Sequence, residues 1–180
     1  MRRILLLAVS VATLAACQPP SSAPSGSTQS TTTAPTPAVV MCNEVTPDPT
    51  QARMPAALPP PAVAALSENL RGGPIIPGTY DMTSGVLQGG ATGWTEARAV
   101  AINVADSDAG TVLNYAETRG AETARWTATL NDAPPSTLAF TCGRTGSAEV
   151  TYAASANELR ITVPAETGAG AIYYVLAKRP

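Results

Sequence analysis

Cys17 is the residue whose position most directly predicts chemistry. Arginines at positions 2 and 3 precede an apolar run, residues 4–14, that is too short to span a bilayer as a helix. The pair Ala15-Ala16 supplies the small side chains that a signal peptidase accepts, and the thiol of Cys17 follows directly. The sequence therefore predicts that residues 1–16 are a secretion signal and that the remaining chain works outside the cytoplasm.

The stretch Leu14-Ala15-Ala16-Cys17 resembles the lipobox of bacterial lipoproteins. In that family the cysteine is diacylated on sulfur, with palmitate among the expected chains, the peptide is cut before it, and the new amino group is usually acylated. Each buried methylene contributes about 0.8 kcal/mol, so two or three chains hold a protein at the membrane essentially permanently. The alternative is that Cys17 is an ordinary cysteine of a soluble secreted protein cleaved at the alanines.

The resemblance also implies an address in the cell envelope. Gln18 follows the cysteine, where an Asp signals inner-membrane retention in enterobacterial lipoproteins. The outer membrane is therefore favoured over the inner membrane.

Two further cysteines, Cys42 and Cys142, are expected to form a disulfide because thiols pair in an oxidising compartment. The alternatives are a reactive thiol or a metal ligand. Both need a nearby base or further soft ligands, and the sequence contains no histidine.

A spacing of acidic residues resembles a calcium loop. Asp106, Asp108 and Glu117 match positions 1, 3 and 12 of an EF-hand, but Thr111 stands where the loop needs glycine, and strands flank the segment in place of helices. Asp, Ser and Gly are also the residues that turns select. We predict a hairpin turn and no metal site.

The sequence lacks the residues that most hydrolases use. It contains no histidine, no Gly-x-Ser-x-Gly motif and no Ser-x-x-Lys motif. Carboxylates are the remaining acid/base candidates, and their positions at strand starts and on outward faces favour solvated surface charge. These carboxylates are Asp81, Glu96, Glu117, Glu122, Glu149 and Glu158. We predict no catalytic residue, no cofactor and no enzymatic activity.

The charge balance argues against nucleic acid as a partner. Loss of the two signal-segment arginines reduces eleven basic side chains to nine, against thirteen acidic ones, for a net charge of −4. Phosphate binding needs clustered basic residues, and here only Lys178 and Arg179 are adjacent.

Two segments precede the folded domain. Residues 17–40 are rich in Ser, Thr and Pro and carry no charge, which predicts a disordered tether behind the lipidated cysteine. Residues 41–76 are expected to be irregular and packed on the domain, with one short helix over residues 62–71. Val63, Leu66 and Leu70 form its apolar stripe.

From residue 77 to residue 180 the apolar pattern has period two, which predicts a β domain. Eight strands are expected, over residues 79–84, 97–105, 111–117, 121–130, 137–142, 149–154, 158–163 and 171–178. The alternation places one set of side chains inside: Val100, Ile102, Val104, Leu138, Phe140, Leu159, Ile161, Ile172, Tyr174 and Leu176. Short spacers make successive strands antiparallel neighbours, and closing such an up-and-down meander into a barrel removes its edges.

The barrel resembles the calycin and lipocalin architecture over about residues 77–179. In that family a Gly-x-Trp strand start packs against a basic residue of the last strand. Here Gly78-Thr79-Tyr80 opens the domain, with tyrosine in place of tryptophan, and Lys178-Arg179 ends it. The resemblance implies the shape of the domain more than its ligand.

Aromatic residues are the remaining candidates for binding. Five of them are expected to line the interior, where they either fill it or form the wall of a small apolar pocket. These are Tyr80, Trp126, Phe140, Tyr152 and Tyr174. Trp94 lies in a glycine-rich loop, and it is either a contact residue for a ligand or partner or a lid over the core.

The sequence thus predicts a membrane-anchored envelope lipoprotein that is not catalytic and displays a small β domain for binding a protein partner or for a structural role. Trp94, Tyr80 and Trp126 are its candidate contact residues. The alternative function is transport of a small apolar ligand or lipid inside a calycin-like barrel.

Overall fold

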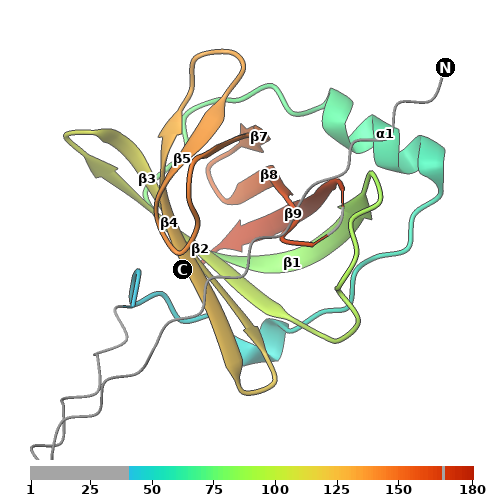
Figure 1. Ribbon diagram of the computed structural model, residues 1–180. Coiled ribbons are helices and arrows are strands. Elements are labelled where there is room, and N and C mark those ends of the chain that lie inside the picture. The colour runs from blue at the N-terminus through green and yellow to red at the C-terminus, as the bar shows by residue number, and fades with distance from the viewer. Residues whose placement is uncertain (1–40, 168) are drawn as a thin grey trace, which may run out of the picture. The chain divides into compact units, whose positions relative to one another are not determined.

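Period-two strands joined by short turns form one antiparallel sheet of nine strands that curls into a nearly closed barrel (Figure 1). The computed structural model describes residues 41–167 and 169–180, so the signal segment, Cys17 and the tether of residues 17–40 lie outside the described residues. The strands are β1 (Gly78–Gln88), β2 (Ala99–Ser107), β3 (Gly110–Arg119), β4 (Glu122–Asn131), β5 (Thr137–Cys142), β6 (Ser147–Glu149), β7 (Thr151–Ala154), β8 (Glu158–Pro164) and β9 (Ala171–Lys178).

One short segment brings the two edges of the sheet together. The strand order is β6-β5-β4-β3-β2-β1-β9-β8-β7, so β6 and β7 are its two ends, yet only Val150 separates them in sequence. Glu149 pairs with β5 and Thr151 pairs with β8, while the Val150 amide donates to the Ser136 carbonyl at 2.9 Å. The predicted up-and-down barrel is therefore confirmed. Its sixth strand is divided in two, because the chain changes partner at Val150.

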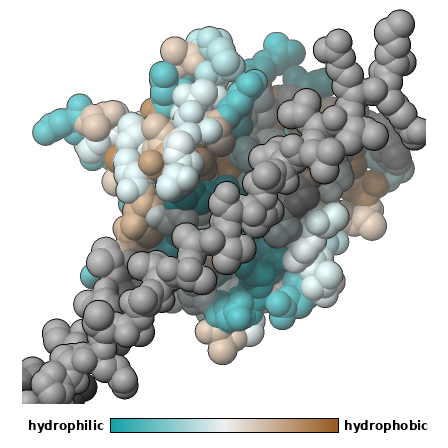
Figure 2. Space-filling model, in the orientation of Figure 1, coloured by the Kyte–Doolittle hydropathy of each residue, from teal (hydrophilic) through white to brown (hydrophobic). Residues whose placement is uncertain are grey.

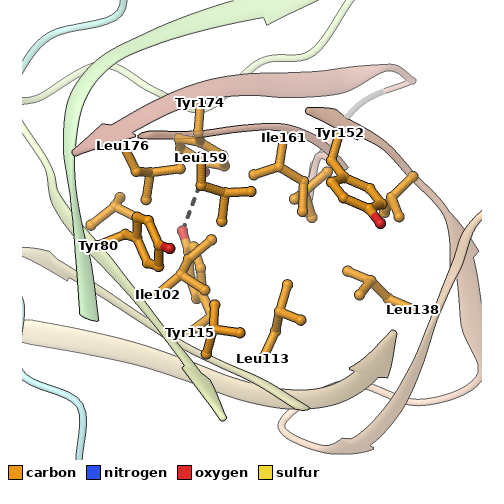
Figure 3. Packing of buried hydrophobic residues seen from close by; sticks show 14 of the residues in the cluster. Tyr80, Ile102, Leu113, Tyr115, Leu138, Tyr152, Leu159, Ile161, Tyr174 and Leu176 are labelled. Carbon is orange, nitrogen blue, oxygen red and sulfur yellow. Dashed lines mark hydrogen bonds between the residues drawn. The ribbon is translucent and has the colours of Figure 1, made fainter. Parts of the chain in front are cut away.

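Apolar side chains from every side of the barrel fill its interior (Figure 3). The largest fully buried ones are Trp126, Tyr80, Met82, Ile102, Leu113, Leu138, Leu159, Ile161, Leu176, Val100 and Val104. All ten residues predicted to lie inside are buried except Phe140, which is only partly buried. The ladder between β5 and β6 ends at Ala139, and the Phe140 amide makes the last backbone hydrogen bond across this pair, to the Gly146 carbonyl at 2.9 Å. Phe140 therefore lies at the end of this strand pair, where less of its ring is covered.

A short helix, α1 (Pro60–Glu68), lies before the barrel, and it begins and ends earlier than the predicted 62–71. Proline fits the first helical turn because its fixed φ suits a helix and its missing N–H has no partner there in any case. The helix ends before Leu70, and the Asn69 amide group donates to the Ala65 carbonyl at 3.0 Å. Val63 and Leu66 are half-buried.

The irregular segment before α1 is pinned to the outside of the barrel. The disulfide between Cys42 and Cys142 is present, with the two Cα atoms 5.4 Å apart. The Asn43 amide group donates to the carbonyls of Tyr115, at 3.2 Å, and of Trp126, at 3.0 Å. A 3₁₀ turn, Pro49–Gln51, follows.

The first and last strands of the β domain are neighbours in the sheet. Lys178 on β9 lies opposite Tyr80 on β1. A Cβ built on Gly78 would lie 2.7 Å from the Lys178 Cε, so the lysine stem crosses the first residue of β1 at close range.

Within residues 41–167 and 169–180, no helix has the length and apolar character needed to cross a membrane.

Gly85 on β1 leaves the space that the ring of Trp94 occupies, and a Cβ built there would collide with that ring. We expect Gly85→Ala to lower the free energy of unfolding by about 1–3 kcal/mol, the usual effect of overpacking a filled core. Urea denaturation followed by the tryptophan emission tests this. Gly120→Ala measures the other cost of adding a Cβ, because the new atom there meets nothing within 4 Å but the backbone is left-handed. It should lose about 1–2 kcal/mol from that backbone alone and leave the tryptophan emission of the folded protein unchanged. Gly85 has no left-handed backbone, so a Gly85→Ala variant as stable as the wild type would contradict the packing argument.

Candidate functional site

A small cavity opens at the end of the barrel where β3 and β8 finish. Its volume is about 130 Å³. Five charged side chains from four parts of the chain meet in it: Arg98, Glu117 and Arg119 of β3, Arg144 and Glu166. This barrel mouth is the candidate site.

Glu117 is the buried centre of the charge cluster, with 2 % of its surface exposed. Its Oε1 lies 3.1 Å from the Nη1 of Arg98 and 3.2 Å from the Nε of Arg119. The prediction that Glu117 is a solvated surface charge is therefore wrong. It shares the inward face of β3 with Leu113 and Tyr115, and the two guanidinium groups offset the cost of burying its charge.

Asp81 is also less exposed than predicted, at 8 %. It faces outward from β1, but the segment before α1 crosses over it, and the Arg179 guanidinium donates to its two oxygens at 2.5 and 2.6 Å. Among the other carboxylates, Glu96, Glu122 and Glu149 are exposed, as predicted, and Glu158 is half-buried.

Two tyrosine hydroxyls connect the buried carboxylate to the core. Tyr115 donates to the Oε2 of Glu117 at 2.6 Å, and its oxygen lies 3.2 Å from the hydroxyl of Tyr174 (Figure 3). Burial, together with the adjacent Tyr174 and Glu117, raises the pKa of Tyr115 well above its ordinary value. Burial likewise raises the pKa of Tyr174. Both hydroxyls therefore stay protonated and act as hydrogen-bond donors near neutral pH.

Arg119, Arg144 and Glu166 form the outer rim of the cavity. The two oxygens of Glu166 lie 3.8 Å from the Nη2 atoms of Arg119 and Arg144, one oxygen facing each arginine. These distances are too long for direct hydrogen bonds. Arg144 is held in place by a hydrogen bond to the Pro164 carbonyl at 3.2 Å and by a contact with the Phe140 ring at 5.5 Å.

Of the three candidate contact residues, only Trp126 lines the cavity, and Trp94 lies behind it, beside Arg98. Trp94 is folded over the core with 4 % exposed, its Nε1 donating to the Arg53 carbonyl at 3.3 Å. The Arg98 guanidinium lies 5.4 Å from its ring centre. Trp126 stacks on Tyr115 with ring centres 4.7 Å apart. Tyr80 lies at the opposite end of the barrel, fully buried, and its hydroxyl donates to the Ile76 carbonyl at 2.6 Å.

The acidic residues that resemble a calcium loop are separated by the hairpin. Asp106 and Asp108 lie exposed at the turn between β2 and β3, whereas Glu117 lies opposite Val100 at the far end of the same pair of strands. The predicted hairpin turn is confirmed. The described residues contain no group of three or more His, Cys, Asp or Glu that could hold a metal ion.

Most of the site was not predicted from the sequence. Neither the three arginines nor Glu166 were identified as site residues. One signal was available. Glu117 continues the inward alternation of Leu113 and Tyr115, and Arg98 lies two residues before inward-facing Val100. Charged residues that continue an apolar alternation at the end of a strand therefore mark a barrel mouth.

Comparison with known proteins identifies the start of the chain. Residues 1–18 match the family described as "Prokaryotic membrane lipoprotein lipid attachment site", which includes Cys17. No curated protein and no solved structure matches the chain. The chain thus carries a lipoprotein attachment site, and the barrel behind it is described by its own geometry.

Proposed function

We propose that this protein is an outer-membrane lipoprotein that displays a non-catalytic barrel and acts by binding at the barrel mouth. The lipid attachment site at residues 1–18 implies anchoring to a membrane, and Gln18 after the cysteine favours the outer one. The main support for this proposal is that side chains fill the barrel interior. A filled barrel has no room for a ligand inside, so only its ends and its outer surface can bind a partner.

The size of the cavity argues against transport of a lipid. Ligand pockets for drug-sized molecules occupy about 300–1,000 Å³, whereas the space at the barrel mouth is about 130 Å³. Tyr80, Leu138 and Ile161 are among the side chains that occupy the rest of the interior without solvent exposure. An acyl chain could enter only by displacing this packed core.

The contacts of the Glu117 carboxylate with other side chains argue against a role in acid/base catalysis. A general acid or base must reach a substrate proton, but the two oxygens of Glu117 already face Arg98, Arg119 and the Tyr115 hydroxyl. The cluster is better suited to holding charge in place than to transferring protons.

The outer surface of the β domain exposes few large apolar side chains, as expected for a domain that faces water. The large apolar side chains exposed among the described residues all precede β1, at Met41, Met54, Leu58 and Ile76. The face in Figure 2 is a mosaic of hydrophilic and hydrophobic residues. Binding is therefore expected to depend on polar and charged contacts.

Native mass spectrometry of the mature lipoprotein, released gently from detergent, distinguishes display from transport. We expect a mass equal to the polypeptide with its anchor and nothing more. A stoichiometric apolar molecule that is lost on denaturation would overturn the proposal and establish the carrier function. A Leu138→Ala variant, which opens space in the core, is the positive control for detecting added apolar ligands.

A further inference from the structure

The barrel mouth has an excess of positive charge within an acidic protein. Arg98, Arg119 and Arg144 line it against Glu117 and Glu166, which leaves one net positive charge among the lining residues. The mature chain as a whole carries a net charge of −4. This local reversal of sign favours an anion over a neutral or cationic guest.

Donors of the two rim arginines lack an acceptor among the described residues. Deeper in the site, the Nε of Arg98, whose side chain is 7 % exposed, has no hydrogen-bond partner there, and neither has the Oε1 of Glu117. The Nη2 atoms of Arg119 and Arg144 have Glu166 only at 3.8 Å, outside hydrogen-bonding distance. Unpaired donors in a partly enclosed site favour binding of a group that supplies acceptor oxygens.

The inner wall of the cavity is apolar and limits the size of the guest. Trp126, Val163 and Ile172 line it together with the two tyrosine rings. A cavity of about 150 Å³ can hold one benzene molecule, and this one measures about 130 Å³. It therefore suits a guest with a short hydrocarbon body and one anionic end.

We propose that the barrel mouth binds a small monocarboxylate, whose carboxylate is held between Arg119 and Arg144 and whose hydrocarbon end lies against Trp126 and Ile172. Guanidinium and carboxylate groups match in a paired hydrogen-bonding geometry. Glu166 now faces these two arginines, and its side chain is 43 % exposed, so it can turn toward solvent as the guest enters. This inference rests on the proposed binding function and names the class of ligand.

The test is a titration of the full mature lipoprotein, in a non-ionic detergent, with butyrate, butyramide and inorganic phosphate. The chain has two tryptophans. Trp126 lines the cavity, and the ring of Trp94 lies 5.4 Å from the guanidinium of Arg98, which also lines it, so tryptophan fluorescence reports on binding. We expect a saturable change with millimolar butyrate and none with butyramide, which has the same shape without the charge. A response to butyramide equal to that to butyrate would overturn the role of the arginines. An equal response to phosphate would overturn the role of the apolar wall.

Three variants locate the site. Arg144→Gln should weaken butyrate binding at least about tenfold, because it removes a charge-assisted hydrogen bond. Glu166→Gln should strengthen binding about fivefold by removing the competing carboxylate. Arg160→Gln is the matched control, since Arg160 lies on β8 paired with Glu158 at 2.7 Å and does not line the cavity.

The gain expected for Glu166→Gln keeps the proposal falsifiable even if Arg144→Gln fails to fold, because misfolding does not tighten binding. Unchanged or weaker binding by Glu166→Gln, or a loss in Arg160→Gln as large as that in Arg144→Gln, would overturn the site. Butyrate that gives no saturable response would overturn the ligand class. The proposed display function would then still stand on the native mass measurement, which depends on the barrel interior alone.

Discussion

Cys17→Ala will move the protein out of the membrane fraction or leave it as an uncleaved precursor. The lipid attachment site over residues 1–18 makes this thiol the acceptor of the acyl chains. One acyl chain gives only marginal membrane binding, whereas two or three make it practically irreversible. The expected effect is therefore nearly all-or-none. Cell fractionation followed by intact mass measurement checks it.

The matched control is the double variant Cys42→Ser/Cys142→Ser, which also removes thiols but leaves the attachment site intact. It should remain in the membrane fraction with the mass of a lipidated chain. A Cys17→Ala protein that has the mobility of the mature form and still sediments with membranes would contradict lipid anchoring at this residue.

The barrel could be predicted from the sequence because its pattern is local. Alternation in Leu159, Ile161 and Val163 places one face of a strand inside, and short spacers leave successive strands few choices of partner. The place where the barrel closes was harder to predict. Nothing in the residues around Val150 shows that the chain there leaves β5 for β8, because that change depends on the curvature of the whole sheet.

The site was harder to predict than the fold because its parts meet only in three dimensions. Glu117 was expected in solvent, where an unpaired carboxylate is most stable, and its burial depends on Arg98 and Arg119 from other positions in the chain. Asp81 has an outward position, as its place on β1 suggests, but the chain around Thr46 covers it. Sequence periodicity reports which way a side chain points, and it does not report what lies on top of it.

The disulfide attaches the beginning of the described chain to the barrel. Cys42 immediately follows the first described residue, and Cys142 is the last residue of β5. The hydrogen bonds of Asn43 to β3 and β4 continue the same attachment. Residues 42 and 43 are therefore attached to three neighbouring strands, β3, β4 and β5.

Removal of the disulfide in Cys42→Ser/Cys142→Ser should lower the free energy of unfolding by about 2–5 kcal/mol. The two cysteines are 100 residues apart in sequence, and closing a loop of that length is worth about 4.7 kcal/mol in the chain-entropy account. Small domains have a total stability of about 5–15 kcal/mol, so the variant could lose a third or more of it. Urea denaturation followed by tryptophan emission measures the change.

Wild-type protein treated with a reductant is the control, because it breaks the same bond without changing the sequence. Its unfolding midpoint should fall to that of the double variant. Hydrogen exchange should also become faster at the Val45 amide, which donates to the Asn43 side chain at 3.2 Å, because the attachment of this segment then depends on hydrogen bonds alone. Equal midpoints for the oxidised and reduced proteins would mean that these hydrogen bonds hold the segment without help from the covalent link, and that the disulfide does not limit unfolding.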